Sequence, residues 1–311
     1  MHRVIIDTDP GQDDGVAILL ALASPEIEVL GLTTVGGNVP LPLTTRNALA
    51  VLELAGRAEI PVHAGAEGPL RRPLVTAEHV HGRTGLDGVE LPEPAARAAP
   101  GHAADFIVET LRREPPGTVT LCPLGPLTNI ATAFERDPDV APRVREIVLM
   151  GGAYFEVGNI TPAAEFNIYV DPEAAAAVLA SGCEVTILPL DATHEVLTTP
   201  ERLGRLRGLG NRAGEVVASW CGFFERFDKE KYGGEGAPLH DPCVIARLIR
   251  PGLFSGRRIN VEVETASDLT RGMTVADWWG VTDRAPNATF LGGADAEGFW
   301  ELLLERLAGL P

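Results

Sequence analysis

Basic residues are scarce in this sequence. Its 311 residues include 43 Asp and Glu against 26 Lys and Arg, which gives a formal net charge of −17 at pH 7. Such an excess of negative charge repels nucleic-acid backbones and other polyphosphates at long range. We therefore expect no nucleic-acid partner, and a neutral small molecule or a cation suits this chain better as a ligand.

Long hydrophobic runs are also missing. The longest uninterrupted apolar run near the N-terminus covers residues 16–23, which is too short to span a bilayer. A strand pattern already begins at Val4, so no signal peptide fits ahead of it. These features predict a cytoplasmic protein without a membrane partner.

Cysteine is rare and scattered. The four cysteines are Cys122, Cys183, Cys221 and Cys243, and no two have the C-x-x-C spacing of a zinc or redox site. Their neighbours are apolar, so we expect buried free thiols.

The rest of the composition is typical of a globular protein. Hydrophobic residues make up 45% of the chain, and the 34 Gly and 25 Pro are spread along it, which excludes a disordered or collagen-like chain. No internal repeat or low-complexity linker interrupts it. We therefore expect a single domain that covers residues 1–311.

Short apolar runs typical of strands alternate with longer helical patterns. The clearest predicted strands cover residues 4–6, 29–34, 119–121, 147–150 and 185–188. The predicted helices between them cover residues 15–23, 44–54, 103–113, 127–134 and 173–179. This order predicts an α/β fold with an open, mostly parallel sheet and helices on both faces.

Four carboxylates follow the first predicted strand, at the sheet edge where ligands of such folds bind. They are Asp7, Asp9, Asp13 and Asp14, and they bracket a Pro-Gly turn. One or two acids could cap the next helix, but four would repel one another unless a cation neutralised them. Because all the candidate ligand atoms are oxygens, the set favours a hard cation. It suits Ca²⁺, whose coordination is flexible and of higher number, and Mg²⁺ stays possible.

A histidine and an acid far along the chain offer two further groups. Asp241 stands at the start of a predicted helix over residues 242–249, so it either caps that helix or completes the metal shell. His240 beside it is either structural or an acid toward a leaving group.

Residues 158–167 place two amides and an acid among small and apolar residues. Asn159, Glu165 and Asn167 can form paired hydrogen bonds to the vicinal hydroxyls of a sugar. The alternative is a polar loop that caps its own turns. Asn38, in a glycine-rich loop after the second predicted strand, offers one more amide.

Two other segments could border a site. The irregular stretch over residues 65–101 carries His79 and His81 and could form one wall. Residues 214–232 are predicted to form a helix that serves either core packing or a substrate lid. Its aromatic residues are Trp220, Phe223, Phe224, Phe227 and Tyr232.

The residues DTDPGQDD at positions 7–14 resemble the DTDPGxDD signature of the inosine-uridine nucleoside hydrolases. Further blocks follow in family order, at 37–38, 81–82, 85–88, 125–129, 150–152, 165–167, 240–241 and 270–274. The resemblance therefore covers nearly the whole chain. It implies a Rossmann-like nucleoside hydrolase fold, homodimers or homotetramers, and hydrolysis of the N-glycosidic bond of ribonucleosides to ribose and free base.

The resemblance also implies roles for individual residues. Asp9 would be the general base, and His240 would protonate or hydrogen-bond the leaving base. The Ca²⁺ ligands would be Asp9, Asp14, Asp241 and the backbone carbonyl of Leu124. The residues around the ribose would be Asp13, Asn38, Met150, Asn159, Glu165 and Asn167, and those near the base would be His81, Phe166, Phe227 and Tyr232. Leu124 departs from the Thr that is frequent in the family, but a carbonyl ligand does not need the side chain.

The presence of His240 suggests a member of the inosine-uridine or pyrimidine type. Purine-only members carry aromatic stacking residues around the site, and the sequence leaves open whether Trp220 or Phe227 reaches that place.

Two other functions fit parts of the pattern. Haloacid-dehalogenase-like phosphatases also begin with a strand that runs into Asp-x-Asp, and Asp7 would then attack phosphorus. The Pro-Gly after Asp9 and the lack of a later lysine and paired-acid motif argue against them. The other alternative is a nucleoside-binding protein without turnover, which the intact Asp9 and metal set argue against.

Overall fold

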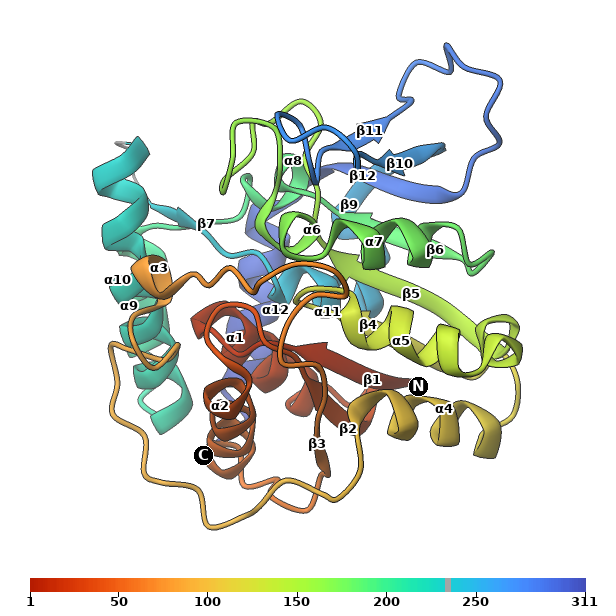
Figure 1. The fold of residues 1–311 in the computed structure, drawn as a ribbon. Coiled ribbons are helices and arrows are strands. Elements are labelled where there is room, and N and C mark those ends of the chain that lie inside the picture. The colour runs from red at the N-terminus through yellow and green to blue at the C-terminus, as the bar shows by residue number, and fades with distance from the viewer. Residues whose placement is uncertain (233–235) are drawn as a thin grey trace.

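An eight-stranded sheet runs through the structure and takes strands from both ends of the chain (Figure 1). The structure is a computed structural model that describes residues 1–232 and 236–311, with side chains of residues 1–227 and 236–311. The strand order is β3-β2-β1-β4-β5-β6-β12-β9. In chain order these strands are β1 (His2–Thr8), β2 (Ile27–Thr34), β3 (Val62–Ala64), β4 (Val119–Pro123), β5 (Val144–Met150), β6 (Val185–Leu188), β9 (Phe254–Ile259) and β12 (Ala288–Ala294).

All neighbouring strands of this sheet pair in parallel except β12 and β9, which pair antiparallel at one edge. The mostly parallel α/β sheet predicted from the sequence is therefore confirmed. Two small antiparallel ladders stand apart from it, and the sequence patterns did not predict them. Their strands are β7 (Leu197–Thr198) with β8 (Ala237–Pro238), and β10 (Val261–Val263) with β11 (Thr274–Ala276).

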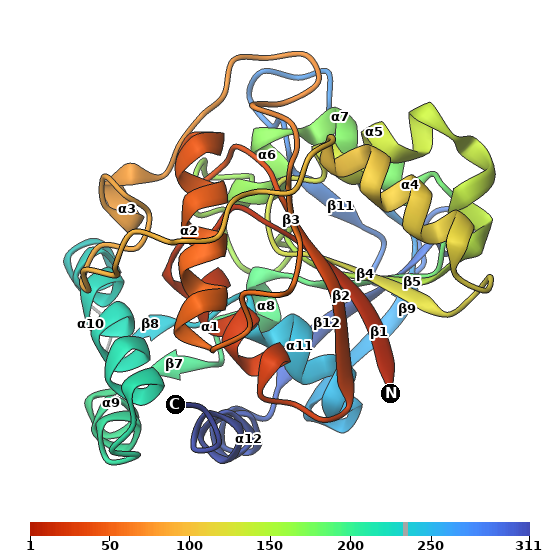
Figure 2. The ribbon, with the colours of Figure 1, turned by 90° about the horizontal axis from the view of Figure 1, so that it is seen from below.

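Helices cover both faces of the sheet. The α-helices are α1 (Gln12–Leu22), α2 (Leu41–Leu54), α3 (Glu78–His81), α4 (Ala103–Arg113), α5 (Thr128–Arg136), α6 (Phe166–Val170), α7 (Pro172–Leu179), α8 (Leu190–Thr193), α9 (Pro200–Arg207), α10 (Arg212–Tyr232), α11 (Pro242–Ile249) and α12 (Ala296–Leu307). Short 3-10 helices cover Pro138–Arg143 and Pro251–Leu253. Figure 2 shows β1 and β2 with α1 and α2 on one side and α4 and α5 on the other.

Alternation along β1 explains the two layers. Val4 and Ile6 belong to the larger apolar cluster, with residues of α1, α2, α10, α11 and α12. Ile5 belongs to the second cluster, with residues of α4, α5 and α7. Successive side chains of a strand point to opposite faces, so an apolar run without polar interruption is what a strand covered on both sides requires.

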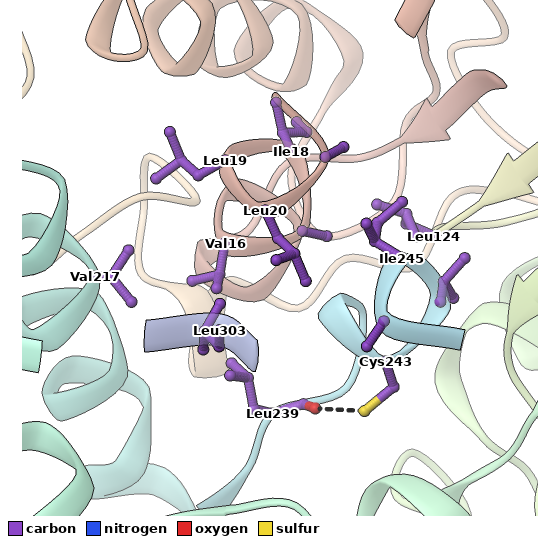
Figure 3. Packing of buried hydrophobic residues seen from close by; sticks show 14 of the residues in the cluster. Val16, Ile18, Leu19, Leu20, Leu124, Val217, Leu239, Cys243, Ile245 and Leu303 are labelled. Atoms are coloured by element: carbon purple, nitrogen blue, oxygen red, sulfur yellow. Dashed lines mark hydrogen bonds between the residues drawn. The ribbon is translucent and has the colours of Figure 1, made fainter. Parts of the chain in front are cut away.

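Helix α1 lies in the centre of the larger cluster (Figure 3). Every residue from Gln12 to Ala21 is buried, and the helix packs against α2, α10, α11 and α12. Figure 3 shows Val16 and Leu20 of α1 with Leu303 of α12 and Ile245 of α11, which belong to the same cluster. A helix that is apolar all round belongs in a core, and this burial fixes the position of the acids in its first turn.

The carboxyl ends of β1 and β4 define the place where a ligand is expected. The chain leaves β1 for β2 and β3 on one side, while β4, β5 and β6 follow on the other side. In open α/β sheets, ligands bind at such a reversal of strand order. The acid-rich turn after β1 and residues 124–129 after β4 both lie there.

The four cysteines are free and buried, as the sequence predicts. None of the helices in the described ranges is long and apolar enough to cross a membrane. The single domain over residues 1–311 stays a prediction, and the continuous sheet favours it.

Candidate active site

A pocket opens at the carboxyl ends of the parallel strands. It encloses about 840 Å³ of empty space, counting the open solvent at its mouth. Its lining residues are Asp13, Asn38, Ala77, His79, Val80, His81, Leu124, Met150, Asn159, Ile160, Glu165, Phe166, Asn167, His194, Phe224, Phe227, His240 and Asp241. Residues from nine separate stretches of the chain therefore share one cavity.

Three acids meet on one side of this pocket. Carboxylate oxygens of Asp13, Asp14 and Asp241 lie within 4.8 Å of one another, and all three residues are buried. The acid at position 241 thus reaches two acids that follow β1, while Asp9, which the resemblance also names as a ligand, is not part of this group. Geometry alone also adds Asp13 to the group, whereas the resemblance assigns that residue to the ribose.

Asp9 is fully buried behind the lining residues. Its Oδ2 accepts a hydrogen bond of 2.7 Å from the backbone N–H of Asn38. Its Oδ1 is buried and has no hydrogen-bond partner among the described residues. A buried carboxylate oxygen without a donor is costly, so this atom is available to a cation, a water molecule or a polar ligand.

Two glycines enclose the Asp9 carboxylate. A Cβ on Gly125 would lie 2.1 Å from Asp9 Oδ1, and a Cβ on Gly37 would lie 2.0 Å from Oδ2. Any side chain at either position would have to displace the carboxylate. The glycines of the loops after β2 and β4 therefore create the space that Asp9 occupies.

Burial and mutual repulsion shift the pKa values of the four acids. Burial, and then the charge of Asp14, raises the pKa of Asp9 well above its ordinary value. Burial raises the pKa of both Asp13 and Asp14 to about 6. For Asp241, burial comes first and the charges of the other three acids follow, and they raise its pKa well above the ordinary value. A divalent cation among them would remove this repulsion.

Helix capping explains only one of these acids. Asp14 accepts hydrogen bonds from the backbone N–H groups of Gly11 (2.9 Å) and Asp9 (3.3 Å) and from the Thr8 hydroxyl, so it does cap α1. Asp241 stands at the N-cap of α11 but makes no side-chain capping bond. Its carboxylate therefore serves the pocket and not the helix end.

Another part of the lining carries Glu165 and two asparagines. The Glu165 carboxylate accepts from the backbone N–H groups of Gly152 (3.0 Å), Asn167 (2.9 Å) and Ile168 (3.2 Å). Burial nevertheless raises its pKa to about 7. Asn159 Oδ1 accepts from the Phe166 N–H at 2.9 Å. The capping alternative thus describes part of this loop, although all three polar residues also line the pocket.

Asn167 connects this wall to the strand ends. Its Nδ2 donates to the carbonyl of Leu124 at 2.7 Å and to the carbonyl of Met150 at 3.2 Å. On the other side, Asn38 Nδ2 donates to the Asp9 carbonyl and to Asp14 Oδ2, both at 3.2 Å. These amides hold the acids and the carbonyl of Leu124 in place, whatever else they bind.

Two half-buried histidines from different segments line the pocket. His81 Nδ1 lies 2.6 Å from Gln12 Oε1, and burial lowers its pKa to about 4. His240 Nδ1 lies 2.8 Å from the Thr193 hydroxyl. Burial, followed by the nearby His194 and His81, lowers the pKa of His240 to about 3. Both imidazoles are therefore neutral at pH 7 in the metal-free protein.

Only some of the aromatic residues of α10 line the pocket. Trp220 is fully buried in the core, and its ring would meet a Cβ on Gly15 at 2.8 Å. Phe227 lines the pocket and contacts His79 edge-on, with ring centroids 5.3 Å apart. The sequence left open whether Trp220 or Phe227 reaches the site. Phe227 lines the pocket and Trp220 does not. The side chain of Tyr232 lies outside the described residues.

The sequence analysis did not name four of the lining residues, Ala77, Val80, Ile160 and His194, whereas His79 and Phe224 lie in the two segments that it expected to border a site. His194 could have been found, because it follows the predicted strand over residues 185–188 by six positions and strand ends were the places to inspect. The apolar ones carry no local signal of a site.

Asp7 forms its hydrogen bonds with residues outside the acid cluster. Neither Asp7 nor Asp9 is among the lining residues. Asp9 lies close enough to Asp14 and Asp13 for their charges to raise its pKa, whereas the Oδ1 of Asp7 accepts from the Thr33 hydroxyl and from Asn129 Nδ2 at 2.8 Å. A phosphatase nucleophile would have to face the substrate. The geometry therefore argues against the phosphatase alternative.

Comparison with known proteins agrees with this geometry. The family model described as inosine-uridine preferring nucleoside hydrolase matches residues 4–301. The chain belongs to this family. It is a nucleoside hydrolase, and the resemblance in its motifs is thereby confirmed.

Relatives of this nucleoside hydrolase match along its whole length. It is 47% identical over 306 residues to the pyrimidine-specific ribonucleoside hydrolase RihA of Photobacterium profundum, with 98% of each chain covered. A plant nucleoside hydrolase has a similar structure, with a TM-score of 0.93, 36% identity and 99% of each chain covered. A purine-preferring ribonucleoside hydrolase from Gardnerella vaginalis also has a similar structure. Its TM-score is 0.92 and its sequence identity is 33%, with 99% of this chain and 98% of the other covered. The nucleoside hydrolase fold is therefore confirmed.

Gly125→Ala tests the enclosure of Asp9 in this nucleoside hydrolase. The three atoms nearest to the added Cβ all belong to the Asp9 side chain, so the carboxylate must turn while the backbone stays. We expect kcat/KM for ribonucleosides to fall about 10²-fold, the cost of a misplacement of about 1 Å, while the melting temperature changes little. Gly204→Ala on α9, where an added Cβ meets nothing within 4 Å, is the matched control and should keep full activity. Full activity in the Gly125 variant would show that the position of Asp9 is not critical.

Proposed function

We propose that this nucleoside hydrolase prefers pyrimidine ribonucleosides and uses Ca²⁺ held by Asp9, Asp14, Asp241 and the carbonyl of Leu124. The observation that carries the proposal is the meeting of buried acids with the Asn159, Glu165 and Asn167 wall in one pocket. Acids that bind a cation and polar groups that bind hydroxyls are the two elements a ribose site needs.

The residues present fit a calcium ion. Asp9 Oδ1 has no hydrogen-bond partner among the described residues, and a carboxylate oxygen in that state is a suitable ligand. The carbonyl of Leu124 accepts one hydrogen bond, from Asn167, and keeps a second lone pair. The donors are all oxygen atoms, which Ca²⁺ prefers, and they come from three separate segments that can adapt to its coordination.

Asp9 is the proposed general base. A Ca²⁺ ion held by these residues would lower the pKa of a water molecule and would bind ribose hydroxyls. Asp9 accepts the proton of the attacking water with the carboxylate that Gly37 and Gly125 enclose. The glycosidic carbon becomes oxocarbenium-like as the base departs, so the surrounding negative charge also favours the transition state.

The other lining residues hold the two parts of the substrate. Asp13, Asn38, Asn159, Glu165 and Asn167 face the ribose. The base lies toward the histidines and Phe227, where His240 donates a hydrogen bond to the departing base. Binding energy from the ribose thus orients the reacting bond.

A pyrimidine preference follows from the residues around the base. The lining includes His79, His81, His194 and His240, and no tryptophan or tyrosine among the residues with described side chains. As the bond breaks, a pyrimidine carries negative charge on its exocyclic carbonyl oxygen, which hydrogen-bond donors stabilise more than stacking does. The 47% identity to a pyrimidine-specific hydrolase, against 33% to a purine-preferring one, supports the same choice.

A panel of uridine, cytidine, inosine and adenosine, scored by released ribose, tests the proposal. We expect kcat/KM for uridine and cytidine to exceed the purine values by at least about 10-fold, which is a modest discrimination for a binding pocket. Higher values for inosine or adenosine would contradict the base preference. Binding of all four without release of ribose would favour the non-catalytic alternative. Homodimer or homotetramer assembly and a cytoplasmic location stay predictions from the resemblance and the sequence.

A further inference from the structure

The short helix α8 places a buried hydroxyl behind His240. Thr193, the last residue of α8, is fully buried. Its Oγ1 lies 2.8 Å from His240 Nδ1. His240 lines the pocket, so Thr193 holds one nitrogen of the imidazole from behind and leaves the other, Nε2, for the pocket.

The position of Thr193 is firmly determined. Its backbone N–H donates to the carbonyl of Pro189 at 3.1 Å. The neighbouring Asp191 accepts from the backbone N–H groups of residues 154, 155 and 156, at 2.9, 2.6 and 3.2 Å. These bonds join α8 to the loop that leads to Asn159. The hydroxyl therefore has a fixed place relative to both His240 and the ribose wall.

The direction of the Thr193–His240 hydrogen bond follows from the available acceptors. The Thr193 hydroxyl has one hydrogen to donate, and among the described residues His240 Nδ1 is its only hydrogen-bond partner. If Nδ1 carried a proton, the hydroxyl would accept that bond and its own hydrogen would be buried without an acceptor, which is costly. The hydroxyl therefore donates and Nδ1 accepts.

We propose that Thr193 is a positioning residue that fixes His240 as the tautomer with its proton on Nε2, so that Nε2–H donates a hydrogen bond to the leaving pyrimidine. The inference deepens the proposed function and rests on it for the identity of the leaving group. The tautomer of a histidine is set by the bond that its other nitrogen makes. Nothing in the proposed ribose and metal contacts requires Thr193.

The reaction balances without a change in the protonation of His240. The C1′–N bond breaks, and its electron pair leaves with the base, whose oxygen accepts the hydrogen bond from Nε2. The attacking water gives its hydroxyl to C1′ and its proton to Asp9. That proton returns to the base as products leave, so ribose and neutral base are formed.

A histidine side-chain ¹H–¹⁵N correlation spectrum of the calcium-supplied protein tests the tautomer directly. His240 is assigned by the loss of its signals in His240→Gln. We expect Nδ1 to resonate as an unprotonated nitrogen that accepts a hydrogen bond, and Nε2 as an N–H. Thr193→Val, which keeps the shape and removes the hydroxyl, should lose that pattern, and Thr193→Ser should keep it. A proton on Nδ1 in the parent protein would overturn the proposal.

Kinetics provide the second readout. With uridine, we expect Thr193→Val to lower kcat about 10- to 100-fold with little change in KM, and Thr193→Ser to restore most of it. A 4-nitrophenyl riboside needs no donor to its leaving group, so its kcat should hardly change. The matched control is Thr120→Val, at a buried threonine whose hydroxyl has no partner among the described residues, and it should behave as the parent.

Two results separate this inference from the proposed function. If Thr193→Val matches Thr120→Val in both spectrum and kcat, Thr193 does not position His240. If the parent hydrolyses no riboside, the proposed function fails, while the spectrum still decides the tautomer.

Discussion

Asp9→Asn is expected to lower kcat for ribonucleosides by about 10²–10⁴-fold, the usual contribution of a general base. Asn has nearly the shape of Asp, so its side-chain oxygen can still accept from the N–H of Asn38, which lies 2.7 Å from Oδ2. The amide cannot take a proton from water. Circular dichroism and the melting temperature should therefore match the parent, while steady-state release of ribose nearly stops.

Asp7→Asn is the matched control for this prediction. Asp7 is equally buried and only two residues away, but its oxygen accepts from Thr33 and Asn129 outside the pocket. An asparagine can accept the same bonds, so most of the activity should remain. Loss of activity in Asp7→Asn with normal activity in Asp9→Asn would refute the base assignment and would revive a phosphatase-like site.

Removal of divalent metal with EGTA is expected to abolish turnover and to lower the melting temperature, and added calcium should restore both. Calcium at about 100 times its Kd adds about 2.7 kcal/mol to the free energy of unfolding, which corresponds to several degrees in a protein of this size. Differential scanning calorimetry and a ribose assay on the same samples measure both effects. Full activity after thorough removal of metal would contradict the calcium proposal.

Asp241→Asn separates metal binding from folding. This variant should show no calcium-dependent change in melting temperature. Without metal it should be at least as stable as the metal-free parent, because one of the buried negative charges is gone. A calcium-dependent rise equal to that of the parent would remove Asp241 from the proposed ligands.

The pH dependence of stability should reverse with metal. In the metal-free protein, burial raises the pKa of Asp13 and Asp14 to about 6, above the ordinary value of about 4 for an unfolded chain. Between these values the folded state binds more protons, so the free energy of unfolding should rise as pH falls from about 7 to about 4. With calcium bound it should fall over this range, because ligands must be deprotonated.

Elements with a strong local pattern were predictable. Helices over residues 103–113 and 242–249 were predicted with the bounds that the structure has. Each has a clear apolar face, and Pro242 stands at a first helical position, where proline is favoured. The five predicted strands are all present, because a strand buried on both faces is a nearly continuous apolar run.

Elements that depend on distant partners were not predictable. The middle residues of β9 are exposed and include Arg257 and Arg258, so this edge strand has little apolar pattern. Strand β12 contains the Gly292-Gly293 pair just before its last residue, which weakens any strand signal. Both become strands because they pair with each other, and β12 also pairs with β6.

The sequence by itself determined the class of fold and the chemical groups of the site, because periodicity over about ten residues and the acids after β1 are local properties. Only the tertiary structure decided where these groups point. Strand β1 ends at Thr8, so strand alternation no longer dictates the direction of Asp9, while Asp7 turns toward Asn129. The approach of Asp241 to Asp14 depends on the packing of α11 against α1, an interaction between segments more than 200 residues apart in the chain that no local pattern encodes.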